Sequence, residues 1–155
     1  MGNQHTTPLS MIMDLEIKAA RKSARTYTSR EDRCRHIMTT LLPGTSFSKC
    51  RPKWNRNPET GRPLELDMFE PAVKPRGWIG GLAVEADGVQ HTRYHPLFHS
   101  SKEDYENQVK RDHATTYNCR RHRVYLIRVP SRERLCDSKL CVFLADALGS
   151  IPKFS

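Results

Sequence analysis

Three carboxylates stand near the ends of two segments that have strand-like patterns. Residues 64–69 (LELDMF) follow a period of two, with the leucines and the methionine on one face and Asp67 on the other. Residues 79–87 (IGGLAVEAD) are mainly apolar and end with Glu85 and Asp87. Because side chains at positions i and i+2 of a strand point to the same face, Glu85 and Asp87 are expected side by side. Asp67 joins them if the two strands pair as a hairpin.

Carboxylates that converge in this way repel one another unless a cation neutralises them. Oxygen-rich clusters suit Mg²⁺ or Mn²⁺, which keep several water ligands and leave room for a phosphate. A cation held there polarises a phosphoryl oxygen and activates water, which is the chemistry of phosphodiester hydrolysis. The alternative interpretation is that the three acids are strand-edge residues paired with the chain's surplus of Lys and Arg.

The composition favours a small basic protein that meets polyanions. The chain has 155 residues, which fits one domain, and a formal net charge of +9, which attracts nucleic acids. Its five cysteines form no close CxxC pair, so reduced thiols in the cytoplasm or nucleus fit better than a disulfide framework. There is no apolar run of roughly 20 residues and no signal-type beginning, so we expect an intracellular protein with no membrane partner.

Turn signals and hydrophobic periodicity divide the chain into helices and strands. Residues 1–27 are expected to form a basic N-terminal arm with a helix, and residues 28–150 a single domain. The expected order is two helices, two strands, a long helix, a strand and a last helix. The expected bounds are 14–25 and 29–42 for the first helices, 64–69 and 79–87 for the first strands, Ser100 onward for the long helix, 124–129 for the third strand, and Asp137 or Ser138 onward for the last helix.

Two capping boxes are predicted at helix starts. Thr28 with Glu31 and Ser100 with Glu103 have the S/T-x-x-E spacing in which the two side chains cap each other's backbone amides. Each box marks the beginning of a helix that the apolar periodicity also indicates.

A series of short motifs follows in a recognisable order between residues 28 and 130. The E-x-D-G-x-Q-H string from Glu85 to His91, directly after an apolar strand, is the most specific of them. Through these motifs the chain resembles the PD-(D/E)XK, or restriction-endonuclease-like, nucleases. It is most similar to the branch of very-short-patch-repair-like and large-DNA-virus endonuclease-like proteins. The motifs are FSKCRPKW (47–54), NPETG (57–61), LELD (64–67), VEADGVQH (84–91), Phe98-His99, Arg111-Asp112 and LIRVP (126–130).

The resemblance implies an α/β fold and a metal site. The fold would be a restriction-endonuclease-like core, a central mixed sheet of four to five strands flanked by helices, with Mg²⁺ or Mn²⁺ at the forked edge of the sheet. Asp67 and Glu85 match the family's two acids. Asp87 stands where relatives commonly have Lys, which suggests a further metal ligand in place of a cation. Glu31 matches an acid that some members contribute, or else it serves only the capping box.

Two departures from the family pattern keep a second interpretation open. One is Asp87 at the position of the usual Lys, for which Lys110 is a candidate substitute. The other is Thr115, where viral relatives tend to have Lys three residues after the Asp of the Arg111-Asp112 motif. A catalytically degenerate protein that keeps the fold as a nucleic-acid-binding module is therefore the alternative to an active nuclease.

Polar residues near the carboxylates are expected to assist them. Gln90 and His91 follow the second strand, and a histidine, with its ordinary pKa of about 6.5, suits proton transfer at neutral pH. Asp112 on the long helix is expected to orient His91 or a basic residue, and His99 to support the site. Each has a bland alternative, namely a structural histidine bonded to a backbone carbonyl or a plain surface acid.

Two zinc sites are weaker alternatives. His91, His95 and His99 are spaced by four, but Pro96 argues against the continuous helix that would align them. Cys119 and His122, with Cys136 and Cys141 further on, form the other set. Cys119 on the inner face of its helix is more often simple core packing.

Basic clusters surround the acidic residues along the chain. Arginine and lysine hold phosphates, and a tryptophan can stack on an exposed base. Each cluster is alternatively a solvated face. The expected nucleic-acid-binding residues are Arg51, Lys53, Trp54 and Arg56, then Lys110, then Arg120, Arg121 and Arg123 beside His122; Lys18, Arg21, Lys22 and Arg25 form a further basic cluster.

The sequence thus predicts a metal-dependent endonuclease that hydrolyses DNA. Its catalytic residues would be Asp67, Glu85, Asp87, Gln90 and His91. RNA is an alternative substrate, and a homodimer is compatible with cutting two strands. The resemblance implies a viral protein acting in a host cell. An interaction protein that uses its basic surface to bind an acidic partner is a further alternative.

Overall fold

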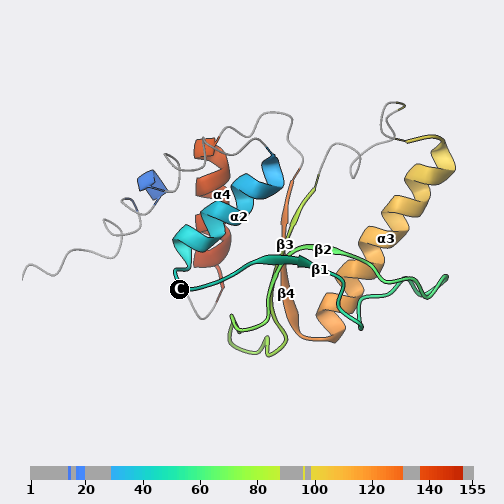
Figure 1. Cartoon of the computed structure of the whole chain (residues 1–155), viewed down its shortest axis with the longest axis horizontal. Coiled ribbons are helices and arrows are strands. Elements are labelled where there is room, and N and C mark those ends of the chain that lie inside the picture. The colour runs from blue at the N-terminus through green and yellow to red at the C-terminus, as the bar shows by residue number, and fades with distance from the viewer. Residues whose placement is uncertain are drawn as a thin grey trace, which may run out of the picture.

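The computed structural model describes residues 29–87, 99–130 and 137–151, together with Asp14, residues 17–19 and Pro96. Within this part of the chain, four strands form one mixed sheet with helices on both faces (Figure 1). The α/β class and the four-stranded mixed sheet agree with the prediction. The elements are α2 (Arg30–Leu41), β1 (Ser48–Cys50), β2 (Leu66–Glu70), β3 (Gly81–Ala86), α3 (Lys102–Arg121), β4 (Val124–Val129) and α4 (Asp137–Gly149).

The sheet has the strand order β1-β2-β3-β4. β2 pairs antiparallel with β1 and β3, as the predicted hairpin requires, and Met68 lies opposite Val84. β3 pairs parallel with β4, and α3 makes the connection between them, so Glu85 lies beside Arg128. Because β2 and β3 are antiparallel, the beginning of β2 lies next to the end of β3. Asp67, the second residue of β2, is therefore brought to Glu85.

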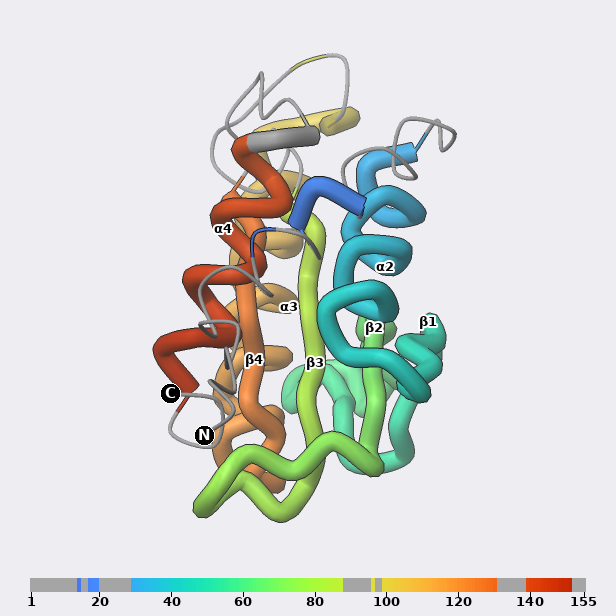
Figure 2. The backbone as a smooth tube through the Cα atoms, turned by 90° about the vertical axis from the view of Figure 1, so that its left-hand side faces the viewer, coloured from blue at the N-terminus to red at the C-terminus, as the bar shows by residue number. Residues whose placement is uncertain are grey.

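The two faces of the sheet are covered by different layers. α2 and α4 pack on one face, and α3 packs on the other (Figure 2). The α2/α4 face holds the larger apolar cluster, with buried residues such as Ile37, Met68 and Leu144. The α3 face holds a small cluster of Leu66, Ala83, Cys119 and Val124. None of the helices in the described ranges is long and apolar enough to cross a membrane.

Both predicted capping boxes are wrong by one residue. The N-cap of α2 is Ser29, whose hydroxyl accepts a hydrogen bond from the Asp32 amide at 3.0 Å. The N-cap of α3 is Ser101, which accepts from the Asp104 amide at 3.1 Å. A serine with an aspartate three residues later caps as well as the predicted S/T-x-x-E pairs. Glu31 is consequently not the capping partner, and its side chain is available elsewhere.

β1 is a strand that the sequence pattern did not predict, and it disturbs the alternation expected for its neighbour. Ser48 lies opposite Phe69 and Cys50 opposite Leu66, so β2 uses one residue more than β1 over the same length. Such a bulge breaks the period of two. Leu66 accordingly packs on the α3 face and Met68 on the α2/α4 face. The prediction that Leu66 and Met68 share one face is therefore wrong.

Candidate active site

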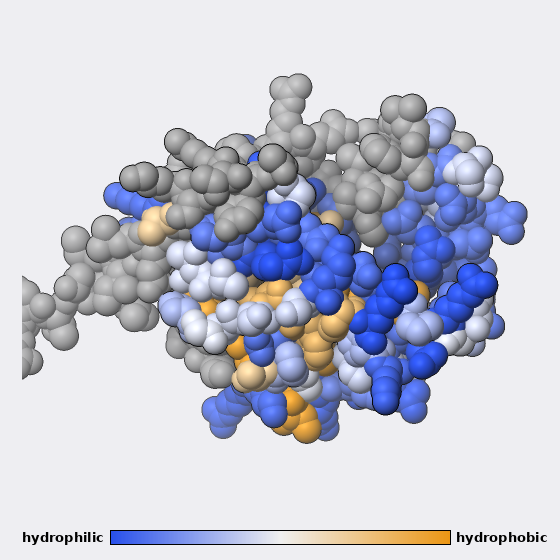
Figure 3. Space-filling model, viewed as in Figure 1, coloured by the Kyte–Doolittle hydropathy of each residue, from blue (hydrophilic) through white to orange (hydrophobic). Residues whose placement is uncertain are grey.

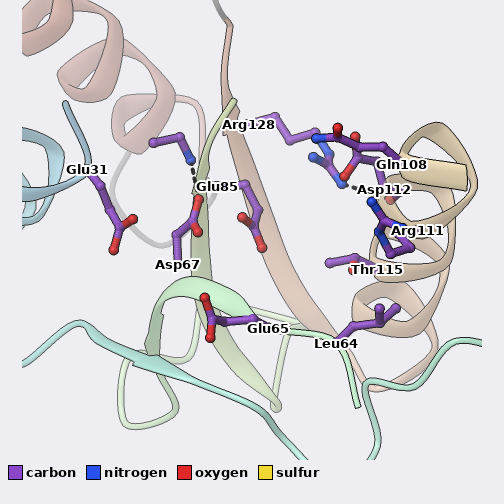
Figure 4. Close-up of a pocket in the computed structure, with 11 residues that line it drawn as sticks. Glu31, Leu64, Glu65, Asp67, Glu85, Gln108, Arg111, Asp112, Thr115 and Arg128 are labelled. Atoms are coloured by element: carbon purple, nitrogen blue, oxygen red, sulfur yellow. Dashed lines mark hydrogen bonds between the residues drawn. The ribbon is translucent and has the colours of Figure 1, made fainter. Parts of the chain in front are cut away.

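A pocket of about 300 Å³ lies between the sheet and α3 (Figure 4). Acids are the commonest of the residues that line it, and two arginines line it on the side of α3 and β4. Residues from α2, β2, β3, α3 and β4 meet here, so the pocket depends on both faces of the sheet. The polar lining residues are Glu31, Glu65, Asp67, Glu85, Gln108, Arg111, Asp112, Thr115 and Arg128.

Asp67 and Glu85 form the acidic centre of the pocket. Asp67 Oδ2 accepts a hydrogen bond from the Ala86 amide at 3.0 Å, which fixes its carboxylate against β3. Glu85 is 9% exposed, and its Oε1 is buried without a hydrogen-bond partner among the described residues. Burial, a hydrogen bond that the protonated Glu85 carboxyl donates to Asp67, and the charge of Asp67 raise the pKa of Glu85 from 4.5 to about 10. Without a cation, Glu85 therefore holds a proton at neutral pH.

Glu31 reaches the same pocket from the first turn of α2. Its carboxylate accepts hydrogen bonds from Arg35 Nη2 at 2.8 Å and from Lys49 Nζ at 3.1 Å. Arg35 also donates to the Asp67 carbonyl at 3.0 Å, so one guanidinium orients residues of both α2 and β2. The hydrogen bond to Glu31 raises the pKa of Lys49 above its usual value. The structure thus brings Glu31 to the pocket, as the resemblance implied.

Asp87 lies just beyond β3 and is held by a cation. Its Oδ1 accepts from Arg128 Nη1 at 3.0 Å, and its carbonyl accepts from Arg30 Nη1 at 2.9 Å. Arg128 also donates to the Asp112 carbonyl at 2.8 Å and to Thr116 Oγ1 at 2.9 Å. Asp87 lines a neighbouring hollow with Asp112 and Arg128, not the pocket of Asp67 and Glu85.

The predicted cluster of three carboxylates is not assembled in the described part of the chain. No group of three or more His, Cys, Asp or Glu side chains there is arranged to hold a metal ion. Lys110, the predicted substitute for the family's Lys, pairs instead with Glu59 at 3.7 Å on the outer side of α3. The cation beside Glu85 is Arg128, because the parallel register places these two residues together.

The Asp67–Glu85 pair nevertheless fits a divalent cation. Its donors are hard oxygens, one of which is buried and unpaired. Mg²⁺ is commonly held by one or two carboxylates, with waters and substrate phosphates as its remaining ligands. Asp67 and Glu85 would hold the ion, and Glu31 lies on the same wall to hold one of its waters.

The chain has viral relatives. It is 39% identical over 107 residues to uncharacterized protein 033L of Invertebrate iridescent virus 3, a match that covers 69% of this chain and 51% of the relative. It is 36% identical over 90 residues to uncharacterized protein 094L of Frog virus 3, covering 57% of this chain and 54% of the relative. The chain thus spans about half the length of these relatives. No family model matches it, and no solved structure does.

The remaining predicted site residues have mixed outcomes. Gln90 and His91 lie outside the described residues. Asp112 lines the pocket from α3. His99 is buried, and its Nε2 lies 3.1 Å from Oε1 of Gln108, which also lines the pocket. His99 thus supports the α3 wall indirectly.

Some residues of the predicted basic loop make contacts within the protein and are engaged there. The half-buried Trp54 ring stacks on His122 at 4.9 Å between centroids, and its edge meets Phe69. Arg56 donates to the carbonyls of Lys53 and Gly61. The outward-facing cations at this end of the molecule, all exposed, are Arg51, Lys53, Arg56, Arg120, Arg121 and Arg123.

The described residues give no support to either zinc site. Cys119 is buried in the cluster on the α3 face, whereas Cys141 is buried in the cluster on the other face. His91, His95 and Cys136 lie outside the described residues, as do Arg21, Lys22 and Arg25 of the N-terminal cluster.

Sequence reasoning missed the cations that frame the pocket. Arg35, Lys49 and Arg128 each contact or neighbour one of its acids, and Arg111 lines it directly. A usable signal existed for Arg128, which is the lone charge in the apolar run VYLIRV. A charge in such a run is expected to have a partner.

Proposed function

We propose that this chain is a metal-dependent nuclease that hydrolyses phosphodiester bonds in DNA. The observation that carries the proposal is the buried carboxyl of Glu85 beside the half-buried Asp67, in a pocket lined by two arginines. The pKa of Glu85 is raised, and its Oε1 has no hydrogen-bond partner among the described residues. A buried acid next to a second acid destabilises a fold unless a ligand uses them. A basic chain supplies the attraction for a polyanionic substrate.

Each residue of the pocket has a distinct part in this proposal. Asp67 and Glu85 bind a divalent cation, which polarises the scissile phosphate and activates water when it is bound. Glu31, oriented by Arg35 and Lys49, accepts a hydrogen bond from a water molecule at the pocket. Asp87 forms an ion pair with Arg128. We therefore assign Asp87 the role of holding Arg128, and not the role of metal ligand that the sequence predicted.

A nucleic-acid-binding module without chemistry is the second candidate. It is favoured by the absence, among the described residues, of any group of three metal-binding side chains. In that case the exposed arginines at the end of α3 would hold the phosphate backbone, and Glu85 would stay protonated at neutral pH. A homodimer and a role in an infected cell stay predictions under either candidate.

Cleavage of a substrate panel separates the two candidates. Supercoiled plasmid, linear duplex, single strand, four-way junction and RNA are incubated with Mg²⁺, Mn²⁺ or a chelator. The proteins compared are the wild type, Asp67→Asn with Glu85→Gln, and the control Glu59→Gln, which makes the same chemical change on an exposed acid outside the pocket.

A nuclease should cut with Mg²⁺ or Mn²⁺ and not with chelator. The double variant should lose activity by a factor of at least about 100, because it loses the charge that holds the cation, while Glu59→Gln should cut like the wild type. Salt-sensitive binding by all three proteins without any cutting would overturn the nuclease proposal in favour of the binding module.

A further inference from the structure

Arg111 lies on α3 and lines the same pocket as Asp67 and Glu85. Gln108, Asp112 and Thr115 of the same helix line the pocket with it, and Gln108 and Thr115 lie one turn away from Arg111 on either side. Figure 4 shows Arg111 across the pocket from the acidic pair. The guanidinium is half-buried, and in the described ranges it takes part in no hydrogen bond or ion pair.

The other cations around the pocket are already engaged. Arg35 donates to the Glu31 carboxylate and to the Asp67 carbonyl. Lys49 lies 3.1 Å from the Glu31 carboxylate and 3.6 Å from that of Glu65. These contacts orient the acids, and neither of the two cations is among the residues that line the pocket.

Arg128 is engaged as well. It is bound to Asp87, to the Asp112 carbonyl and to Thr116. Arg128 therefore donates four hydrogen bonds within the protein. Arg111 remains as the pocket cation whose donors are available to a ligand.

Partial burial of a guanidinium costs desolvation free energy, and no hydrogen bond or ion pair in the described ranges offsets this cost for Arg111. Its five donors form a planar fork that matches two oxygens of a phosphate. In the view of Figure 3, the coloured surface on the side of the molecule that carries α3 is mostly hydrophilic. The opposite wall would attract the same phosphate through the cation that Asp67 and Glu85 hold.

We infer that Arg111 binds the substrate phosphate at this pocket, opposite the acidic pair. The inference rests on the proposed function and deepens it, because it names the residue that contacts the substrate. It also places the substrate backbone between α3 and the strand ends, on the α3 face of the sheet.

Duplex binding and cleavage of Arg111 variants test the inference. Arg111→Ala and Arg111→Lys are compared with Lys110→Ala, which removes the same charge one residue earlier but on the outer side of α3. Binding of a fluorescein-labelled duplex is measured by anisotropy with Ca²⁺ in place of Mg²⁺, over a range of salt concentrations. Cleavage is measured with Mg²⁺ as kcat and KM, and thermal unfolding checks that the variants fold.

Arg111→Ala should weaken duplex binding at least tenfold more than Lys110→Ala and should raise KM. The slope of log affinity against log salt should fall by about one, the signature of one lost phosphate contact. Arg111→Lys should restore the slope, because the charge returns, and only part of the affinity, because the fork does not.

The inference is overturned if Arg111→Ala and Lys110→Ala have equal effects on binding and cleavage. That result leaves the proposed function intact as long as Asp67→Asn abolishes cleavage. If the wild type never cuts DNA, the proposed function fails, and the anisotropy comparison alone then decides whether Arg111 binds phosphate.

Discussion

The two faces of the sheet use the same four strands for different purposes. On the α2/α4 face, fifteen buried residues of the described ranges form one continuous apolar cluster. On the α3 face the buried apolar cluster has four of the described residues, and next to it is a pocket whose described lining includes five acids and two arginines. The α3 helix packs on the sheet near its C-terminal end and stands over the polar pocket with its middle turns.

This difference separates stability from chemistry. Apolar burial on the α2/α4 face supplies the driving force that holds the sheet together. The α3 face carries the buried carboxyl of Glu85, whose ionisation destabilises the fold in the absence of a ligand. Substitutions on the two faces should therefore change the free energy of unfolding in opposite directions.

The largest effect on stability is expected on the α2/α4 face. Leu144 is fully buried, and Leu144→Ala should lower the free energy of unfolding by about 2–5 kcal/mol, because it leaves a cavity. Val142→Ala, on the same helix but half exposed, should change it by less than about 0.5 kcal/mol. Urea unfolding measures both. Equal effects at the two positions would mean that this face is not the stabilising one.

The opposite sign is expected for Glu85→Gln in the presence of a chelator. The pKa of Glu85 is raised in the folded state, so its contribution to stability is complete below pH 4.5 and is lost as the pH rises toward 10. The glutamine does not titrate. It should make the protein more stable at pH 8, on the order of 1–3 kcal/mol, and should remove this part of the pH dependence.

Unfolding of both proteins between pH 5 and pH 9 (roughly the window in which Glu85 ionises on unfolding) provides the test. Added Mg²⁺ should stabilise the wild type increasingly as the pH rises and should leave Glu85→Gln unchanged. Parallel pH profiles for the two proteins would contradict the claim that ionisation of Glu85 destabilises the folded protein.

The smallest effect is expected for the pair at the edge of the pocket. Asp87→Asn and Arg128→Gln each break the ion pair between these two residues, and the double variant should be more stable than the sum of the single losses predicts, by about 1 kcal/mol.

Mn²⁺ affinity, measured by calorimetry, should fall for Asp67→Asn and not for Asp87→Asn. Equal losses of affinity would restore Asp87 to the metal site that the sequence predicted.

Long elements with strong patterns were predictable from the sequence. The helix after Ser100 and the run VYLIRV became α3 and β4 with nearly the expected bounds. β1 was not predictable, because three partly exposed residues, Ser-Lys-Cys, carry neither alternation nor β-branched side chains. The helix starts were shifted by one residue because an adjacent serine offered an equally good cap.

The acids of the candidate site were predictable, and its cations were not. Asp67 and Glu85 stand at positions that a hairpin brings together, and a hairpin is a local structure. Arg128 reaches Glu85 only through a parallel register between strands separated by α3. Arg111 enters the pocket only because that helix packs with one particular face inward. Neither relationship leaves a short-range pattern in the sequence.

The parallel pairing of β3 with β4 also bears on the stage of folding at which the pocket forms. β2 and β3 can meet early, because the chain between them is short, but β4 must return across the whole length of α3. The Glu85–Arg128 neighbourhood therefore forms late, after most of the chain-closure entropy has been spent. A ligand that needs both residues should slow unfolding strongly and hardly change the rate of folding.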